Sequence, residues 1–160
     1  MSTSATAGQE IVSTRLFAAP RERVFRAFSE PEQLAQWWGP KGFTNTIEEF
    51  DLRPGGRWRL VMQAPNGARF LNESDFLEVE RPERVVFEHL EPVHRFVMTM
   101  TFDEEAGGTR LTWRMRFESA AEHERVKGLV AAANEENFDR LGALLATTAE
   151  SADGPRLTPP

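Results

Sequence analysis

The chain has 160 residues, enough for one domain with its own hydrophobic core, and its 19 Lys and Arg against 25 Asp and Glu give a formal net charge of −6. An acidic chain without a basic run is a poor candidate for binding a nucleic-acid backbone or an anionic membrane surface. Because the sequence has no Cys, disulfides, thiolate catalysis and thiolate metal sites are excluded.

The two ends of the chain predict flexible tails rather than targeting segments. Residues 1–8 lack the basic start and the apolar stretch of a secretory signal, and no apolar run approaches the ~18 residues of a membrane helix. We therefore expect a cytoplasmic protein. The small, polar or Pro-rich residues of 1–8 and 149–160 leave a single domain over 9–148.

The first predicted elements are a strand at 11–18 and two short helices. Pro20 fits the first turn of a helix, and Ser29 with Glu32 has the spacing of a capping box that opens the second helix. The pair Gly39–Pro40 ends that helix. Its apolar side carries Leu34, Trp37 and Trp38. The two Trp rings are either both structural, or one lies in the core and the other at the rim of a cavity.

The hydrophobic pattern then changes to a period of two residues, which is typical of β-strands. Turn-forming pairs such as Asn66–Gly67 separate the strands and predict antiparallel hairpins. The expected strands are 43–52, 57–64, 68–80, 84–90, 95–103 and 109–117.

Three of these strands place large apolar side chains on one face and polar side chains on the other. This alternation predicts a sheet with one buried and one hydrated face. The strand at 68–80 is mixed on both faces, so we expect a β-bulge that switches its faces partway. The apolar sets are Trp58, Leu60 and Met62; Phe96, Met98, Met100 and Phe102; and Leu111, Trp113, Met115 and Phe117.

A long helix is predicted from about 119 to 147, where Ser119 and Glu122 form a second capping box. Its apolar stripe, which Asn134 and Asn137 interrupt, consists of Val126, Leu129, Val130, Ala133, Phe138, Leu141, Leu144 and Leu145. The complete order is one strand, two short helices, six strands and the long helix. It predicts an α+β helix-grip fold, with a curved seven-stranded antiparallel sheet around the C-terminal helix.

Several short motifs in this order resemble the START-like superfamily, also called SRPBCC, and within it the stand-alone activator of Hsp90 ATPase homologue-like branch. They are Ala19–Phe25, Trp37–Pro40, Phe50–Gly56, Leu77–Val79, Pro82–Phe87 and Asn137–Leu141. Members of this branch often carry Gly-Trp where this chain has Ala133–Asn134. The size of a ligand therefore cannot be carried over from the resemblance.

The apolar sheet face and the helical stripe predict a cavity between sheet and helix that takes a small hydrophobic ligand. Asn72 and Ser74 are polar anchors in this cavity if their face is the inner one, and part of an outer polar face otherwise. The expected ligand-binding residues are Trp38, Trp58, Leu60, Met62, Phe70, Asn72, Phe87, His89, Phe96, Met98, Met100, Trp113, Met115, Leu129, Ala133 and Phe138.

No residue pattern indicates a catalytic or metal site. His89 and His94 lack a third ligand at suitable spacing, and we interpret them as histidines near a turn, although His89 shares the alternation of Val85 and Phe87. His123 is expected in solvent. The alternative to a ligand cavity is that the apolar residues of the sheet face and the long helix pack closely against one another. A basic stripe of Arg110, Arg114 and Arg116 is expected to be solvated or ion-paired, or to form a docking surface.

The sequence therefore predicts non-catalytic binding of a small hydrophobic molecule, without a cofactor or metal, by a monomer or homodimer. The resemblance implies two further functions. One is a polyketide cyclase/dehydratase-like or hydrolase-like enzyme, which requires at least two polar groups converging in the cavity. The other is a co-chaperone-like module whose partner is a heat-shock ATPase.

Overall fold

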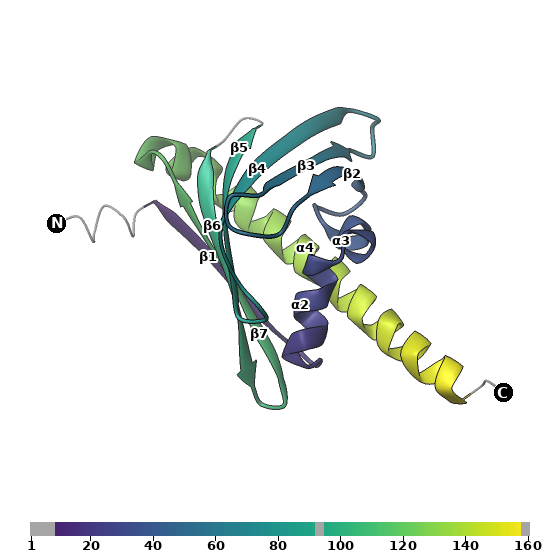
Figure 1. Ribbon diagram of the computed structural model, residues 1–160. Coiled ribbons are helices and arrows are strands. Elements are labelled where there is room, and N and C mark those ends of the chain that lie inside the picture. The colour runs from purple at the N-terminus through teal and green to yellow at the C-terminus, as the bar shows by residue number, and fades with distance from the viewer. Residues whose placement is uncertain (1–8, 92–94, 158–160) are drawn as a thin grey trace.

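The computed structural model describes the backbone of residues 9–91 and 95–157 and the side chains of 9–90 and 95–147. Strand β1 (Glu10–Phe17) leads into helices α2 (Arg21–Ser29) and α3 (Pro31–Trp37). Six strands and the long helix α4 (Ala120–Leu157) follow (Figure 1). The six strands are β2 (Thr44–Phe50), β3 (Arg57–Gln63), β4 (Arg69–Glu80), β5 (Arg84–Glu91), β6 (Phe96–Glu105) and β7 (Gly108–Phe117).

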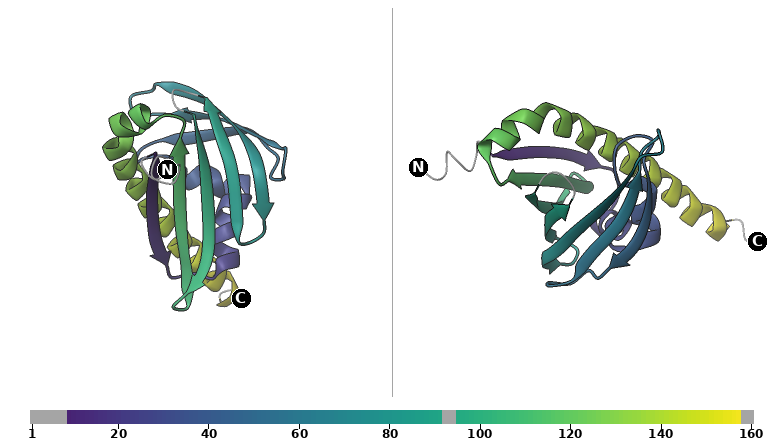
Figure 2. Two further views of the ribbon diagram at one scale, coloured as in Figure 1. Left: turned by 90° about the vertical axis from the view of Figure 1, so that its left-hand side faces the viewer. Right: turned by 90° about the horizontal axis from the view of Figure 1, so that it is seen from above.

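The seven strands form one sheet in the order β1-β7-β6-β5-β4-β3-β2, and every neighbouring pair is antiparallel. The sheet curves, and the three helices lie on its concave side (Figures 1 and 2). Helix α4 packs mainly against β1 and also contacts α2, α3 and β7. The predicted helix-grip fold is therefore confirmed.

The boundaries of the helices differ in two places from those expected. Ser29 does not cap α3, because it is the last residue of α2, and α3 begins at Pro31 with no side-chain cap at Glu30. Proline at the first helical position presets φ and lacks an N–H that would need a partner, so the start needs no capping box. The end of α4 lies at Leu157 rather than near Thr147.

The start of α4 matches the expected cap. The backbone N–H of Glu122 donates to the hydroxyl of Ser119 at 3.0 Å, which satisfies one of the free N–H groups at the helix start. The flexible tails predicted at 1–8 and at 158–160 lie outside the described residues, whereas the backbone of 149–157 continues the helix.

The core fills the concave side of the sheet, and all six residues predicted to point there are buried. They are Trp58, Met98, Met100, Trp113, Met115 and Phe138. The expected bulge in β4 is also present, because the pairing with β5 shifts between Phe76 and Glu78. Phe76 is buried and Leu77 is 45% exposed, and Val79 packs on the core again. The bulge therefore changes which residues of β4 face inward.

Candidate functional site

A cavity of about 170 Å³ lies on the inner face of the sheet, towards the edge formed by β2, β3 and β4. Its walls come from β3, β4, β5, β6 and the residue that follows α3. No described side chain of α4 is among them, so this cavity does not lie between the sheet and the long helix as expected. The lining residues are Trp38, Trp58, Leu60, Asn72, Ser74, Phe87, His89 and Phe96.

Strand register places four of these side chains in one row across four strands. Trp58 of β3 pairs with Ser74 of β4, Ser74 pairs with His89 of β5, and His89 pairs with Phe96 of β6. Directly paired residues on one face of an antiparallel sheet hold their side chains side by side. The inward positions of β3 and β4 also pair Leu60 with Asn72. The two-residue period of the strands thus assembles most of the cavity.

Trp37 and Trp38 have different roles, as one of the two interpretations from the sequence predicted. Trp37 is 1% exposed, and its indole N–H donates to the carbonyl of Ala27 at 2.9 Å. Trp38 lines the cavity and packs its ring against those of Trp58 and Trp113, with centroids 5.0 and 5.3 Å away. The first ring belongs to the core and the second forms part of the cavity wall.

The segment that carries Trp38 is fixed by two polar side chains of α4. The side-chain amide of Asn137 donates to the carbonyl of Trp37 at 2.7 Å, and its oxygen accepts from the N–H of Gly39 at 3.2 Å. Gly39 has a φ of 97°, a left-handed conformation that favours glycine. Together these contacts set the backbone on both sides of Trp38.

The guanidinium of Arg140 completes this anchor through five backbone carbonyls, each 3.0 Å away. The acceptors are the carbonyls of Gln36, Trp38, Gly39, Pro40 and Phe43. Burial lowers the pKa of Arg140, but an arginine remains charged at physiological pH even so. The sequence predicted no role for Arg140. The available signals were that Asn137 interrupts the apolar stripe and that both residues lie in the Asn137–Leu141 motif.

The polar groups of the cavity wall are incompletely hydrogen-bonded. Ser74 is 3% exposed, and its hydroxyl makes no hydrogen bond within the described part of the chain. The indole N–H of Trp58 is buried and has no partner among the described residues. The amide of Asn72 donates to the carbonyl of Phe70 at 3.2 Å, and the ring of His89 stacks on Phe96 with centroids 4.8 Å apart. Buried polar groups usually have partners, so the Ser74 hydroxyl, which lines the cavity, offers a bond to a bound molecule.

The structure brings seven of the sixteen predicted ligand-binding residues to this cavity, together with Ser74, whose inward placement was left open. Five others are close-packed in the core rather than beside the cavity: Met98, Met100, Trp113, Met115 and Phe138. Met62 and Ala133 are partly buried, and neither lines it.

Two predicted lining residues face solvent instead. Phe70 is 41% exposed near the turn between β3 and β4. Leu129 is 76% exposed, so its expected place facing a cavity is wrong. The buried face of α4 is centred on Asn137 and Leu141, and at 3.6 residues per turn Leu129 lies roughly a third of a turn away from it.

The arginines of the basic stripe and His123 do not line the cavity. The expected ion pairing of the basic stripe is confirmed at Arg110, whose hydrogen bond at 2.7 Å lowers the pKa of Glu105. His123 was expected in solvent, but its Nε2 lies 3.0 Å from the carbonyl of Glu10. His94 lies outside the described residues. Within the described part, no three His, Cys, Asp or Glu side chains are grouped to hold a metal ion.

No helix among the described residues is both long and apolar enough to cross a membrane.

Comparison with known proteins gives one family and many similar structures. The family model for "Activator of Hsp90 ATPase homolog 1-like protein" matches residues 18–146. A search of curated proteins found no significant match.

Solved structures from several bacteria share the fold. A protein from Nitrosomonas europaea is 26% identical with a TM-score of 0.82, covering 89% of this chain and 97% of that one. A protein from Mycobacterium smegmatis is 28% identical with a TM-score of 0.78, covering 89% and 94%. A protein from Arthrobacter aurescens is 22% identical with a TM-score of 0.82, covering 89% and 88%, and shows the fold alone.

Proposed function

The chain belongs to the activator of Hsp90 ATPase homologue 1-like family, and we propose that it binds a small, neutral, hydrophobic molecule in the cavity beside Trp38. The observation that carries this proposal is a wall of aromatic rings that also holds the Ser74 hydroxyl, a polar group without a hydrogen-bond partner among the described residues. Binding sites for small molecules commonly combine an apolar lining with a few such groups.

The volume of the cavity suits a ligand of about one ring. An apolar protein cavity of about 150 Å³ holds benzene, and this one measures about 170 Å³. Trp38, Phe87 and Phe96 supply faces and edges against which an aromatic ring packs. A substituted benzene or a ring of similar size therefore fits, whereas a sterol or a long acyl chain needs more space.

The lining also favours a neutral ligand with an oxygen substituent. His89 is the only ionisable side chain among the described residues that line the cavity, so a charged group would be buried without a permanently charged counter-ion, at high cost in free energy. The Ser74 hydroxyl can donate or accept a hydrogen bond, and the Asn72 amide oxygen and nitrogen add an acceptor and a donor. A phenol or an aromatic ketone satisfies both requirements.

The proposal is tested by calorimetric titration with p-cresol, using toluene and benzoate as matched probes of polarity and charge. We expect saturable binding of p-cresol at one site, weaker binding of toluene and the weakest binding of benzoate. Ser74→Leu fills the cavity and should abolish binding, whereas Thr101→Val on the outer face should leave it unchanged. Absence of saturable p-cresol binding by a folded wild-type protein would contradict the proposal and leave capture of a heat-shock ATPase as the next function to test.

An enzymatic function is the second candidate, because Asn72, Ser74 and His89 converge on the cavity. Ser74 and His89 are direct cross-strand partners, which is the residue combination of an activated nucleophile. Strand pairing brings the two residues together but does not by itself make Ser74 a nucleophile, so binding without catalysis is favoured. Hydrolysis of p-nitrophenyl acetate that Ser74→Ala removes, while p-cresol still binds, would instead support catalysis.

A further inference from the structure

A second, more open groove of about 370 Å³ lies where β1 ends, α2 begins and α4 passes across both. Its lining includes the apolar side chains of Leu16, Phe17 and Leu145 and the flat surface over Gly142. Its volume lies in the range of ligand-binding pockets, about 300–1,000 Å³. The groove and the cavity beside Trp38 have no described lining residue in common, so a ligand in the groove is independent of the proposed function.

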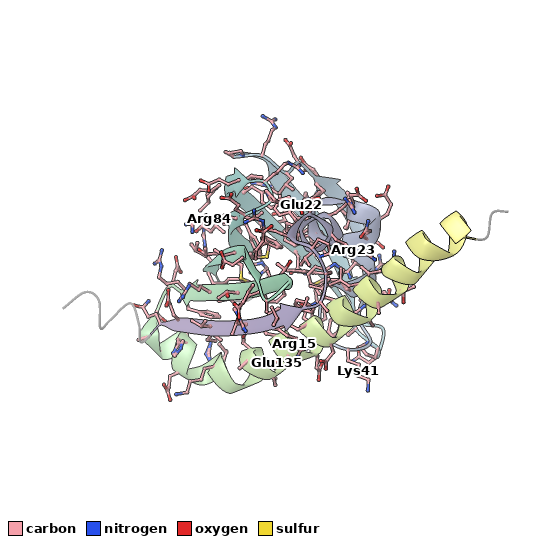
Figure 3. All side chains as sticks on the ribbon, turned by 90° about the horizontal axis from the view of Figure 1, so that it is seen from below. Arg15, Glu22, Arg23, Lys41, Arg84 and Glu135 are labelled. Atoms are coloured by element: carbon pink, nitrogen blue, oxygen red, sulfur yellow. The ribbon has the colours of Figure 1, made fainter. Side chains whose placement is uncertain are left out.

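Two arginines line this groove, and they differ in how their charges are balanced. The Arg15 guanidinium contacts the carboxylates of Glu135 and Asp139, both at 2.7 Å, where β1 crosses α4 (Figure 3). Arg15 also lies over the Phe138 ring, 5.5 Å from its centroid. Its charge is therefore already neutralised.

The charge of Arg23 has no such partner within the described part of the chain. One Nη atom of Arg23 donates to the carbonyl of Leu145 at 3.0 Å, and its Nε is buried without a hydrogen bond. No described carboxylate lies within 4.0 Å of this guanidinium. A partly buried guanidinium beside an apolar surface is the arrangement that binds a carboxylate attached to an apolar chain.

We propose that this groove binds a medium-chain monocarboxylate, with its chain against Phe17 and Leu145 and its carboxylate at Arg23. A single uncompensated guanidinium matches a single negative charge. Glu135 and Asp139 at the Arg15 end of the groove repel a ligand of higher charge, which disfavours phosphates. The proposed orientation therefore places the carboxylate at the Arg23 end.

Calorimetric titration with octanoate and octan-1-ol tests the charge recognition, because the two probes share the same chain. We expect octanoate to bind wild-type protein at least about tenfold more tightly, as a charge-assisted hydrogen bond allows. Arg23→Gln should remove this preference and Arg23→Lys should retain part of it. Equal affinities for the two probes, or unchanged octanoate binding by folded Arg23→Gln, would overturn the proposal.

Matched substitutions of two glycines of α4 test whether octanoate binds in this groove. A Cβ at Gly142 would lie 3.7 Å from the Phe17 ring, so Gly142→Leu fits the helix and fills the groove. A Cβ at Gly128 meets nothing within 4 Å, so Gly128→Leu is the control with the same change in helix propensity. We expect Gly142→Leu alone to abolish octanoate binding, and Ser74→Leu to leave it intact. Binding that survives Gly142→Leu, or is lost in Ser74→Leu, would place octanoate elsewhere and refute the inference.

Discussion

Replacing Arg140 tests whether one side chain of α4 holds the segment that carries Trp38. The two Nη atoms of a guanidinium carry four N–H groups, so the five carbonyl contacts share them, and three of these contacts go to one Nη. At roughly 1 kcal/mol per net hydrogen bond, about four bonds contribute about 4 kcal/mol. Ordering the long side chain costs about 2 kcal/mol in return.

Arg140→Met keeps most of the stem and removes the guanidinium, which leaves partly buried carbonyls without their donor. We expect this substitution to lower the free energy of unfolding by about 2–4 kcal/mol. Arg140→Lys should recover about half of that loss, because an ammonium cannot reach carbonyls spread over the whole segment.

Urea denaturation followed by Trp fluorescence measures both effects. Arg125→Met is the control on the same helix, because the side chain of Arg125 is exposed and pairs with Glu122 one turn away. It should change the free energy of unfolding by less than about 0.5 kcal/mol. A loss below about 1 kcal/mol in Arg140→Met would show that water replaces the guanidinium. The anchoring role argued from the five contacts would then be refuted.

Three further outcomes are expected in the core and on the sheet surface. Trp113 is 1% exposed and packs on Phe138 with centroids 4.8 Å apart, so Trp113→Ala should cost about 3–5 kcal/mol in a urea titration; a cost near 1 kcal/mol would mean that the ring borders a void. Met100 is 1% exposed in the packed core, so Met100→Trp should destabilise by about 1–3 kcal/mol through overpacking and leave p-cresol binding in place. Arg110 lowers the pKa of Glu105, so the stabilisation from this pair is present above the unfolded pKa and is lost as pH falls through the lowered folded value. An NMR titration should show the Glu105 pKa returning upward in Arg110→Met; no change would contradict the pairing.

Much of the fold follows from local pattern. The two-residue alternation identified Trp58, Met98 and Trp113 as inward-facing, and the structure buries all three. Pleating alone determines which side of a strand a residue occupies, so such an inference needs no knowledge of neighbouring strands. The capping prediction at Ser29 failed because Pro31 starts the helix without a side-chain cap.

The cavity was predictable only in part. Inward-facing apolar residues look alike in sequence whether they pack closely, as Met98 does, or border a space, as Phe87 does. The row from Trp58 to Phe96 depends on strand register, and the register of β4 is set by two pairing shifts that no local pattern locates. The hydrogen bonds of Arg140 end on backbone carbonyls of a loop. Every residue has such a carbonyl, so no residue type in the sequence marks the acceptors.

Because α4 holds this loop through backbone atoms, the shape of the cavity rim does not depend on which side chains the loop carries. Asn137 and Arg140 contact backbone atoms of the segment between Gln36 and Phe43 rather than its side chains. A substitution at Trp38 removes none of those backbone donors and acceptors. The rim can therefore exchange its indole for a smaller or more polar group, and so accept a different ligand, while α4 continues to hold the same loop.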